Sequence, residues 1–263
     1  MTKGKERFRK FISDFYLVII LIFLYAPIFT MMVLSFNQSK SRTHWGGFTL
    51  NWYTQMFQSR AIMYALYTTL LVAMISALVA TVIGTVTALA INHMKPVSKN
   101  IFMGISNIPM LNADIVTGIS LMLAFIAFGI SLGFKTVLIS HITFNIPYVI
   151  LSVMPKLKQT DRSTYEAALD LGASPAYAFF PVVFPDIMPG VLSGFLLAFT
   201  MSLDDFIITH FTKGAGINTL STLIYSEVRR GIRPSMYALS TVIFVVVLVV
   251  LLIANFRKQP EKV

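Results

Sequence analysis

The sequence predicts an all-α membrane protein with six transmembrane helices. Of its 263 residues, 56% are hydrophobic and only 12% are charged, whereas soluble domains carry about 25% charged residues. A helix needs about 20 residues to cross the hydrocarbon core of a bilayer. Six apolar segments are long enough, and they are Phe15–Phe36, Ile62–Ile91, Ile101–Ile130, Thr136–Met154, Met188–Ile208 and Tyr237–Phe256.

The first apolar segment is expected to remain as a span. The basic residues before it resemble the start of a signal peptide, but the run Phe15–Phe36 is too long for one and lacks an A-x-A cleavage site. This organisation predicts a basic cytoplasmic tail at 1–14, a first span with its outer loop at 15–61, a transmembrane core at 62–256 and a cytoplasmic tail at 257–263.

The Lys and Arg residues predict the orientation. With the N-terminus inside, the inside segments hold 13 of these residues and the outside loops hold 8, as the positive-inside rule requires. Both termini are then cytoplasmic, and the longest inside loop is 155–187. Four basic residues in the outside loop 209–236 run against the rule. They are consistent with a docking surface for an external partner or with a solvated loop face.

Polar residues and prolines interrupt the third and fourth spans. Such breaks are tolerated where they face protein or a water-filled cavity, so the helices are expected to enclose a pathway. In the fifth span, Gly190 and Gly194 form a G-x-x-x-G pair that permits close helix packing. The interrupting residues are Asn107, Pro109, Asn112 and Asp114 in the third span and His141, Asn145 and Pro147 in the fourth.

Three of the 11 acidic residues, Asp114, Asp204 and Asp205, lie inside predicted spans. A charged residue at the bilayer centre costs about 2.5–3.5 kcal/mol on insertion scales, which makes it a functional candidate. At 1.5 Å per residue, Asp114 and Asp204 lie about 20 Å and about 24 Å from the inner boundary, a similar depth. We expect the three carboxylates to line a path for a solute with ammonium groups.

Two other interpretations of these carboxylates stay open. Asp204 and Asp205 can mark the water-exposed end of the fifth span. Asp114 can pair with a basic residue or cap a broken helix. Substitution of the pair by asparagine distinguishes them, because only a path residue lowers uptake while the complex still assembles.

Several kinds of chemistry are not expected. The chain has no cysteine, which excludes disulfides and thiol nucleophiles. Its four histidines have no metal-ligand spacing, and no G-x-x-x-x-G-K-[ST] phosphate loop is present. No Ser–His or paired-carboxylate arrangement indicates catalysis. We therefore expect a non-enzymatic subunit that binds no metal and no cofactor of its own.

The inside loop 155–187 carries signals for two short helices. Ser163 and Glu166 fit a capping box at the start of the first helix, and Gly172 suits the left-handed position that follows a helix end. Because its spacing is amphipathic, a helix pair lying under the bilayer is one interpretation of this loop.

The second helix of the loop is predicted to begin at Pro175. Ser174 can cap it, and proline is favoured at the first helical position. This helix is expected to end near Pro181, which has no N–H to donate to the preceding turn.

The segment 166–185, "EAALDLGASPAYAFFPVVFP", resembles the EAA motif of permease subunits of binding-protein-dependent ABC importers. That motif reads E-A-A, three residues, G, nine residues and I-x-L-P. The chain departs from it at Val182 and Phe184, which are both apolar, and Pro181 adds a break. The matching residues are Glu166, Ala167, Ala168, Gly172 and Pro185.

The resemblance covers nearly the whole chain. Segments such as "GGFTLNWYTQMF", "DIVTGISLML", "SHITFNIPYVIL", "FTMSLDDFIIT" and "IYSEVRRGIRPSMYAL" occur in the order typical of the spermidine/putrescine type of these permeases. The aspartates at 114, 204 and 205 point to polyamines in particular. The resemblance implies the type I importer permease fold, alternating access and a location in the bacterial inner membrane.

The resemblance also implies partners. In this family the segment with Glu166, Ala167, Ala168 and Gly172 is the coupling helix that docks into an ATPase subunit. Two ATPase copies would hold ATP and Mg²⁺, a second permease subunit would complete the pathway, and an extracytoplasmic binding protein would deliver the substrate. Membrane lipid is a further expected partner, and nucleic acid is not.

Three alternative functions remain. The same machine can carry another solute, such as ferric iron, thiamine or sulfate, although an anion would fit poorly beside three aspartates. An ion-coupled secondary transporter could use Asp114 as a proton relay and would need no ATPase. A structural subunit of a membrane assembly would show no dependence on a substrate.

Overall fold

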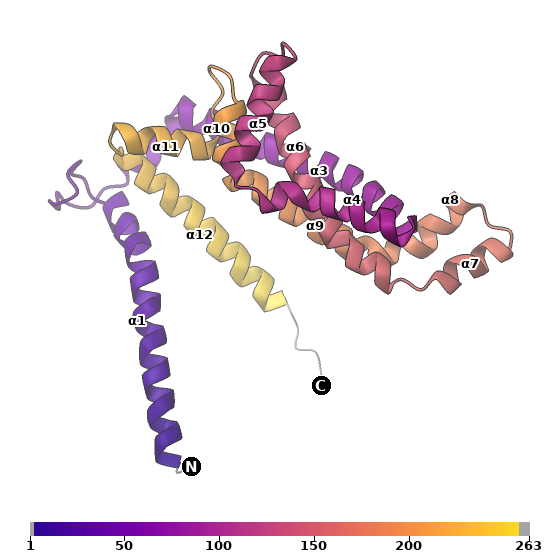
Figure 1. Cartoon of the computed structure of the whole chain (residues 1–263). Helices are drawn as coiled ribbons and strands as arrows, with labels where there is room; N and C mark the ends of the chain where they lie inside the picture. Colours follow the sequence, from indigo (N-terminus) through magenta and orange to yellow (C-terminus); the bar gives the residue numbers. More distant parts are fainter. Residues whose placement is uncertain (1–2, 258–263) are drawn as a thin grey trace. The chain divides into compact units, whose positions relative to one another are not determined.

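The computed structural model describes residues 3–257, and within them the regular secondary structure is helical apart from one isolated β-bridge between Asn37 and Phe48. The all-α prediction is confirmed. The chain divides into two compact units (Figure 1). We call Met1–Met63 with Ser226–Val263 the flanking unit and Tyr64–Tyr225 the core unit.

The flanking unit contains α1 (Lys3–Ser35), α2 (Asn51–Gln58) and α12 (Pro234–Arg257), and α12 contacts both of the others. The loop between α1 and α2 folds around Asn37. The Trp52 indole N–H donates to the Asn37 carbonyl oxygen at 2.7 Å, and the Gly46 N–H donates to the Asn37 side chain at 2.8 Å. Trp52 is therefore buried within this unit.

An ion pair closes the turn before α12. The Arg233 guanidinium donates two hydrogen bonds of 2.6 Å to the carboxylate of Glu227, a residue near the end of α11 (Leu220–Arg230). These hydrogen bonds raise the pKa of Arg233. Gly231 lies between the two partners with φ +101°, a conformation that a side chain would disfavour.

The core unit holds most of the helices. It comprises α3 (Arg60–His93) from Tyr64 onward, α4 (Pro96–Leu111), α5 (Asp114–Ala127), α6 (Phe134–Gln159), α7 (Arg162–Asp170), α8 (Pro175–Ala178), a π-helix (Phe179–Val183), α9 (Phe184–Asp204) and α10 (Ile207–Thr212).

Helix α6 packs between α3 and α9 through glycines. A Cβ atom on Gly84 of α3 would lie 2.7 Å from the Val149 Cβ, and one on Gly194 of α9 would lie 3.3 Å from the Val149 Cα. A Cβ on Gly190 would lie 3.0 Å from the Ser152 carbonyl oxygen. The prediction that the Gly190–Gly194 pair permits close helix packing is therefore confirmed.

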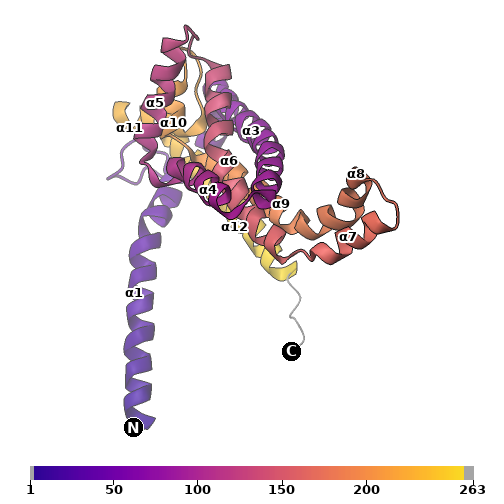
Figure 2. The same ribbon diagram turned by 45° about the vertical axis from the view of Figure 1, so that its right-hand side comes forward.

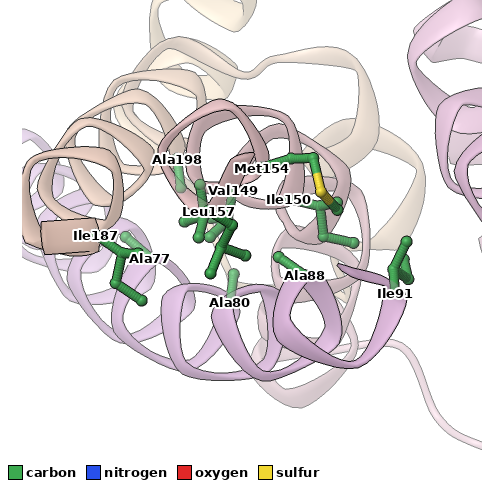
Figure 3. Close-up of a cluster of buried hydrophobic side chains, with 11 residues drawn as sticks. Ala77, Ala80, Ala88, Ile91, Val149, Ile150, Met154, Leu157, Ile187 and Ala198 are labelled. Carbon is green, nitrogen blue, oxygen red and sulfur yellow. The ribbon is translucent and has the colours of Figure 1, made fainter. Parts of the chain in front are cut away.

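A cluster of buried apolar side chains joins these three helices. Figure 3 shows side chains from α3, α6 and α9 pointing toward one another between the ribbons. Three alanines lie on α3 and larger side chains lie on α6, so the helices can approach closely. The cluster is Ala77, Ala80, Ala88, Ile91, Val149, Ile150, Val153, Met154, Leu157, Ile187 and Ala198.

The predicted number of spans is not confirmed. Within residues 3–257, four helical stretches are long and apolar enough to cross a membrane, or five if a bent pair counts as one. The four are Asp14–Ser35, Arg60–His93, Phe134–Gln159 and Phe179–Asp204. The sixth predicted span falls on α12, where the apolar stretch Pro234–Val249 is shorter. Residues 258–263 of the predicted tail lie outside the described residues.

Two predicted spans differ from continuous helices. The third is broken between α4 and α5, which are bent by 102°, so the interruption that its polar residues predict is confirmed. The interruption predicted for the fourth span is wrong, because α6 is one helix from Phe134 to Gln159 with Pro147 inside it. The fifth was predicted to run to Ile208, and this is wrong: α9 ends at Asp204 and α10 begins at Ile207. The cause is local, because Asp205 accepts hydrogen bonds from the first turn of α10.

Candidate functional site

The three predicted carboxylates line one pocket, which we call the acidic pocket. It has a volume of about 350 Å³ and lies where α5, α6, α9 and α10 meet. Its wall combines carboxylates with aromatic and aliphatic side chains, a lining suited to an organic cation. The lining residues are Asp114, Phe144, Met201, Asp204, Asp205, Phe206, Ile207 and Ile208.

Asp114 reaches the pocket because the third span is broken. It is the first residue of α5, directly after the bend, and it is exposed. Gly118 lies one turn further along α5 and lets α10 pack closely, since a Cβ there would be 3.1 Å from the Phe211 ring and 3.4 Å from the Ile208 Cα. Gly118 was not predicted to have a role, although its position in an apolar helix signals close packing.

Asp204 and Asp205 have different surroundings. Asp204 is the last residue of α9 and is exposed. The Asp205 side chain is only 8% exposed. Its Oδ1 accepts from the Ile208 N–H at 3.2 Å, and its Oδ2 accepts from the Thr209 N–H and the Thr209 hydroxyl, both at 2.8 Å. Asp205 thus caps α10 as well as lining the pocket.

A buried histidine lies next to Asp205. His141 of α6 is fully buried, and its Nε2 lies 2.9 Å from the Thr209 Oγ1 and 3.4 Å from the Asp205 Oδ2. Its Nδ1 has no hydrogen-bond partner. The sequence marks His141 as a polar interruption of a span, but its pairing with Thr209 depends on the break at Asp205, which sequence analysis missed.

A second polar cluster ties the three central helices together. Asn145 of α6 donates to the Ser202 hydroxyl of α9 at 2.8 Å, and Ser202 is hydrogen-bonded to Ser76 of α3 at 3.0 Å. These groups are buried, so the hydrogen bonds replace part of those that they would make with water, and the Asn145 Oδ1 has no partner among the described residues. The cluster fixes the register of α9 below the acidic pocket.

Within the predicted loop 155–187, the segment 162–178 forms an arm, which we call the α7–α8 arm. In both views it extends away from the other helices of the core unit (Figures 1 and 2). The cap at its start differs from the prediction: α7 begins at Arg162, and Asp161 rather than Ser163 accepts the capping hydrogen bond, from the Ser163 N–H at 2.9 Å. That hydrogen bond lowers the pKa of Asp161.

The predicted turn after α7 is confirmed. Gly172 has φ +88°, its N–H donates to the Leu169 carbonyl oxygen at 2.9 Å, and the Ala173 N–H donates to the Ala168 carbonyl oxygen at 3.1 Å. This is the Schellman arrangement that ends helices at glycine. The cap on α8 is also confirmed, because the Tyr177 N–H donates to the Ser174 hydroxyl at 3.3 Å.

The second helix was predicted to end near Pro181, and the structure confirms this for its α-helical part only. The α-helical part ends earlier, at Ala178, and the chain continues through the π-helix Phe179–Val183 directly into α9. A wider π turn accommodates Pro181, which lacks the N–H that an α-helical turn would use. The arm is therefore joined to α9 by continuous helical backbone.

The arm presents apolar and polar groups to its surroundings. The side chains of Glu166 and Ala167 are exposed, and Leu171 and Tyr177 are 89% and 71% exposed. Sequence analysis did not single out Leu171 or Tyr177. Between the arm and the ends of α3 and α6 lies a pocket of about 250 Å³, which Glu166 helps to line. Exposed apolar residues on a protruding element are typical of a protein-docking surface.

Comparison with known proteins identifies relatives along almost all of the chain. Residues 80–257 match the family described as binding-protein-dependent transport system inner membrane component. The chain is 38% identical to the putrescine transport system permease protein PotI of Escherichia coli over 88% of this chain and 86% of that protein. It is also 38% identical to the E. coli spermidine/putrescine permease PotC, over 90% of each.

Solved structures show the same fold. A bacterial ABC transporter involved in the import of the acidic polysaccharide alginate matches with a TM-score of 0.74 at 18% identity, over 97% of this chain and 96% of that chain. An amino acid ABC transporter matches with a TM-score of 0.55 at 17% identity, over 80% of this chain and all of that one. The chain is a multi-pass membrane permease with the ABC importer fold, and it belongs to the family of binding-protein-dependent transport system inner membrane components.

Proposed function

We propose that this chain is a permease subunit of an ATP-driven importer of polyamines such as spermidine and putrescine. The observation that carries the proposal is the meeting of Asp114, Asp204 and Asp205 in one pocket. A polyamine is a flexible chain of ammonium groups, and each group needs a carboxylate in place of the water that it leaves. The names of the 38% identical relatives support the same cargo.

The fold by itself leaves the cargo open, since one structural relative is involved in the import of an acidic polysaccharide. The sign of the charge in the acidic pocket distinguishes a cationic from an anionic cargo. An anion such as sulfate would meet the carboxylates and be repelled, and no Lys or Arg lines the pocket among the described residues. Phe144 and Phe206 add aromatic faces, which attract cations.

The proposed mechanism is alternating access driven through the α7–α8 arm. Closure of two partner ATPase subunits on bound ATP and Mg²⁺ moves the arm, which carries Glu166, Ala167, Ala168 and Gly172. The π-helix joins the arm to α9, and α9 ends at Asp204. A helix of 21 residues is about 30 Å long, so α9 connects the arm to the acidic pocket as one continuous helix.

This mechanism also implies which cofactors, cellular location and partners we propose for the chain. The chain holds no nucleotide, metal or other cofactor and catalyses no reaction itself, because hydrolysis takes place on the partner ATPase. Both termini and the arm lie in the cytoplasm, and the acidic pocket opens toward the outside of the inner membrane. A second permease subunit completes the pathway, and an extracytoplasmic binding protein delivers the amine.

Uptake by the assembled importer tests the proposed cargo. Vesicles that contain all subunits and ATP should accumulate labelled spermidine or putrescine, and neither sulfate, thiamine nor ferric iron should compete. Empty vesicles and vesicles without ATP are the controls. Accumulation driven by an ion gradient without any ATPase would support a secondary transporter and contradict the proposal, as would uptake of sulfate but not of amines.

A further inference from the structure

We propose that His141 and Thr209 are positioning residues that hold the Asp205 carboxylate for the cation at the wall of the acidic pocket. This inference rests on the proposed polyamine path. Neither residue lines the pocket. Both act through Asp205, which does.

The hydrogen-bond directions follow from the number of protons. The Thr209 hydroxyl has one hydrogen, and it donates that hydrogen to the Asp205 Oδ2. The His141 Nε2 lies 2.9 Å from the same hydroxyl oxygen, so the imidazole must be the donor in that contact. The chain of donors therefore runs from the His141 Nε2–H to Thr209 and from the Thr209 O–H to Asp205.

This chain of donors leaves the two carboxylate oxygens of Asp205 unequal. Oδ2 accepts from the Thr209 N–H and hydroxyl, and His141 lies 3.4 Å away from it. Oδ1 accepts a single, longer hydrogen bond of 3.2 Å from the Ile208 N–H. A carboxylate has about four lone-pair sites. The spare capacity is therefore on Oδ1, which is the oxygen that remains for an ammonium group.

If the only role of His141 were packing, a buried histidine would be less favourable than an apolar side chain. It is fully buried and its Nδ1 has no partner, and an unsatisfied buried polar atom is unfavourable. Its ring packs edge-on against Phe144 at 5.2 Å between centroids, a contact that leucine or phenylalanine would provide without an unpaired nitrogen. The Nε2–H donor is what an apolar residue at this position would lack.

The contact also joins three elements around the pocket. His141 belongs to α6, Thr209 to α10, and Asp205 to the break after α9. The Thr136 hydroxyl of α6 donates to the Thr212 carbonyl oxygen at 2.7 Å, which ties the other end of α10 to the same helix. Since α10 packs on α5 beside Asp114, the orientation of Asp205 relative to Asp114 depends on these contacts.

The test uses two pairs of variants in the assembled importer, reconstituted in vesicles with saturating spermidine-loaded binding protein. His141→Leu removes the donor, whereas His141→Gln keeps an N–H donor. Thr209→Val removes the hydroxyl at constant shape, whereas Thr209→Ser keeps it. The measurements are the spermidine transported per ATP hydrolysed and the ATPase rate that the loaded binding protein stimulates. A residue needed only for folding would lower assembly and ATP hydrolysis together.

We expect His141→Leu and Thr209→Val each to lower spermidine transported per ATP about fivefold or more, with the stimulated ATPase retained. The Gln and Ser variants should keep at least about half of the wild-type value. The double variant His141→Leu/Thr209→Val should be no worse than the poorer single variant, because both interrupt one chain of donors.

Equal transport per ATP in His141→Leu and the wild type would overturn the inference, as would losses that multiply in the double variant. Asp204→Asn separates this outcome from failure of the proposed function. If Asp204→Asn lowers spermidine uptake and the His141 and Thr209 variants do not, the polyamine path stands and the positioning role falls. If Asp204→Asn also leaves uptake unchanged, the path itself is wrong.

Discussion

Asp204 and Asp205 are adjacent in the sequence but differ in their structural roles. Asp204 is exposed and its carboxylate has no hydrogen-bond partner among those described, whereas Asp205 accepts three hydrogen bonds from α10. The sequence shows the two as equivalent candidates. Which one caps a helix depends on where the chain breaks, and that is decided by hydrogen bonds to Thr209 that no sequence pattern specifies.

The two aspartates should therefore differ in their effect on stability. Asp205→Ala removes both oxygens that accept from the Ile208 and Thr209 N–H groups, and loss of a helix cap costs about 0.5–2 kcal/mol. We expect this variant to lower the unfolding temperature of the detergent-solubilised complex, and Asp204→Ala to leave it unchanged. Equal unfolding temperatures for the two variants would contradict the capping role of Asp205.

At the level of elements, glycines decide how helices meet around both functional regions. Gly190 and Gly194 stand out in the sequence because of their spacing, and the packing of α9 on α6 confirms the prediction. Gly118 makes a contact just as close, but it lacks a glycine partner at a characteristic spacing. Its contacts on α10 become visible only in the folded structure.

Gly118 gives a prediction for the acidic pocket. Gly118→Leu would overlap Phe211 and the α10 backbone, and such overpacking costs about 1–3 kcal/mol. We expect α10 to move away from α5 and spermidine uptake to fall. Because the chain has no cysteine, spin labels on single cysteines at Val116 and His210 can report the separation of the two helices.

Gly104 is the matched control for this experiment, since a Cβ there would meet nothing within 4 Å. Gly104→Leu should change neither the label distance nor the uptake. An unchanged distance in Gly118→Leu would show that Gly118 does not set the approach of α10 to α5.

The α7–α8 arm provides a second prediction about a structural element. Gly172 has φ +88°, where a side chain costs about 1–2 kcal/mol. Gly172→Trp adds bulk to this strain at the turn of the docking surface. We expect it to uncouple ATP hydrolysis from uptake, and Glu166→Lys to act in the same direction by reversing the charge beside the turn. The measurement is the stimulation of the ATPase by loaded binding protein, together with uptake.

Gly129 provides the control for backbone strain. It has φ +68° with nothing within 4 Å of a Cβ and lies between α5 and α6, away from the arm. Gly129→Trp should leave coupling intact. If the Gly172 and Glu166 variants also show normal ATPase stimulation and uptake, the arm is not the coupling element.

For the whole molecule, composition and the EAA motif were sufficient to predict the fold class and the family. The six apolar segments did not yield six confirmed spans, because α4 and α5 are bent by 102° and the apolar stretch Pro234–Val249 of α12 is shorter than the others. Hydropathy reports neither this bend nor the break at Asp205, and these two irregularities bring Asp114 and Asp205 into one pocket. Sequence analysis identified the carboxylates, and the irregular backbone that places them together had to come from the structure.

In the α7–α8 arm, by contrast, most local features could be predicted from the sequence and the path of the backbone could not. Its glycine turn and the cap at Ser174 were predictable because they depend on local backbone chemistry. The path through Pro181 was not, since a π turn and a helix end satisfy the same missing N–H in different ways. This difference matters for the mechanism, because only the continuous path makes α9 a direct link between the arm and the pocket.

The central claim is that ATP-driven uptake passes a cation along the carboxylates of the acidic pocket. Uptake of labelled spermidine by the assembled importer in vesicles, measured together with ATP hydrolysis in Asp204→Asn and Asp204→Glu, tests it most directly. Because a hydrogen bond to a charged group contributes about 1.5–3 kcal/mol, we predict that Asp204→Asn lowers uptake about tenfold or more. The ATPase should still respond to loaded binding protein, and Asp204→Glu should retain most of the uptake. Wild-type uptake in the Asp114→Asn/Asp204→Asn double variant would contradict the claim.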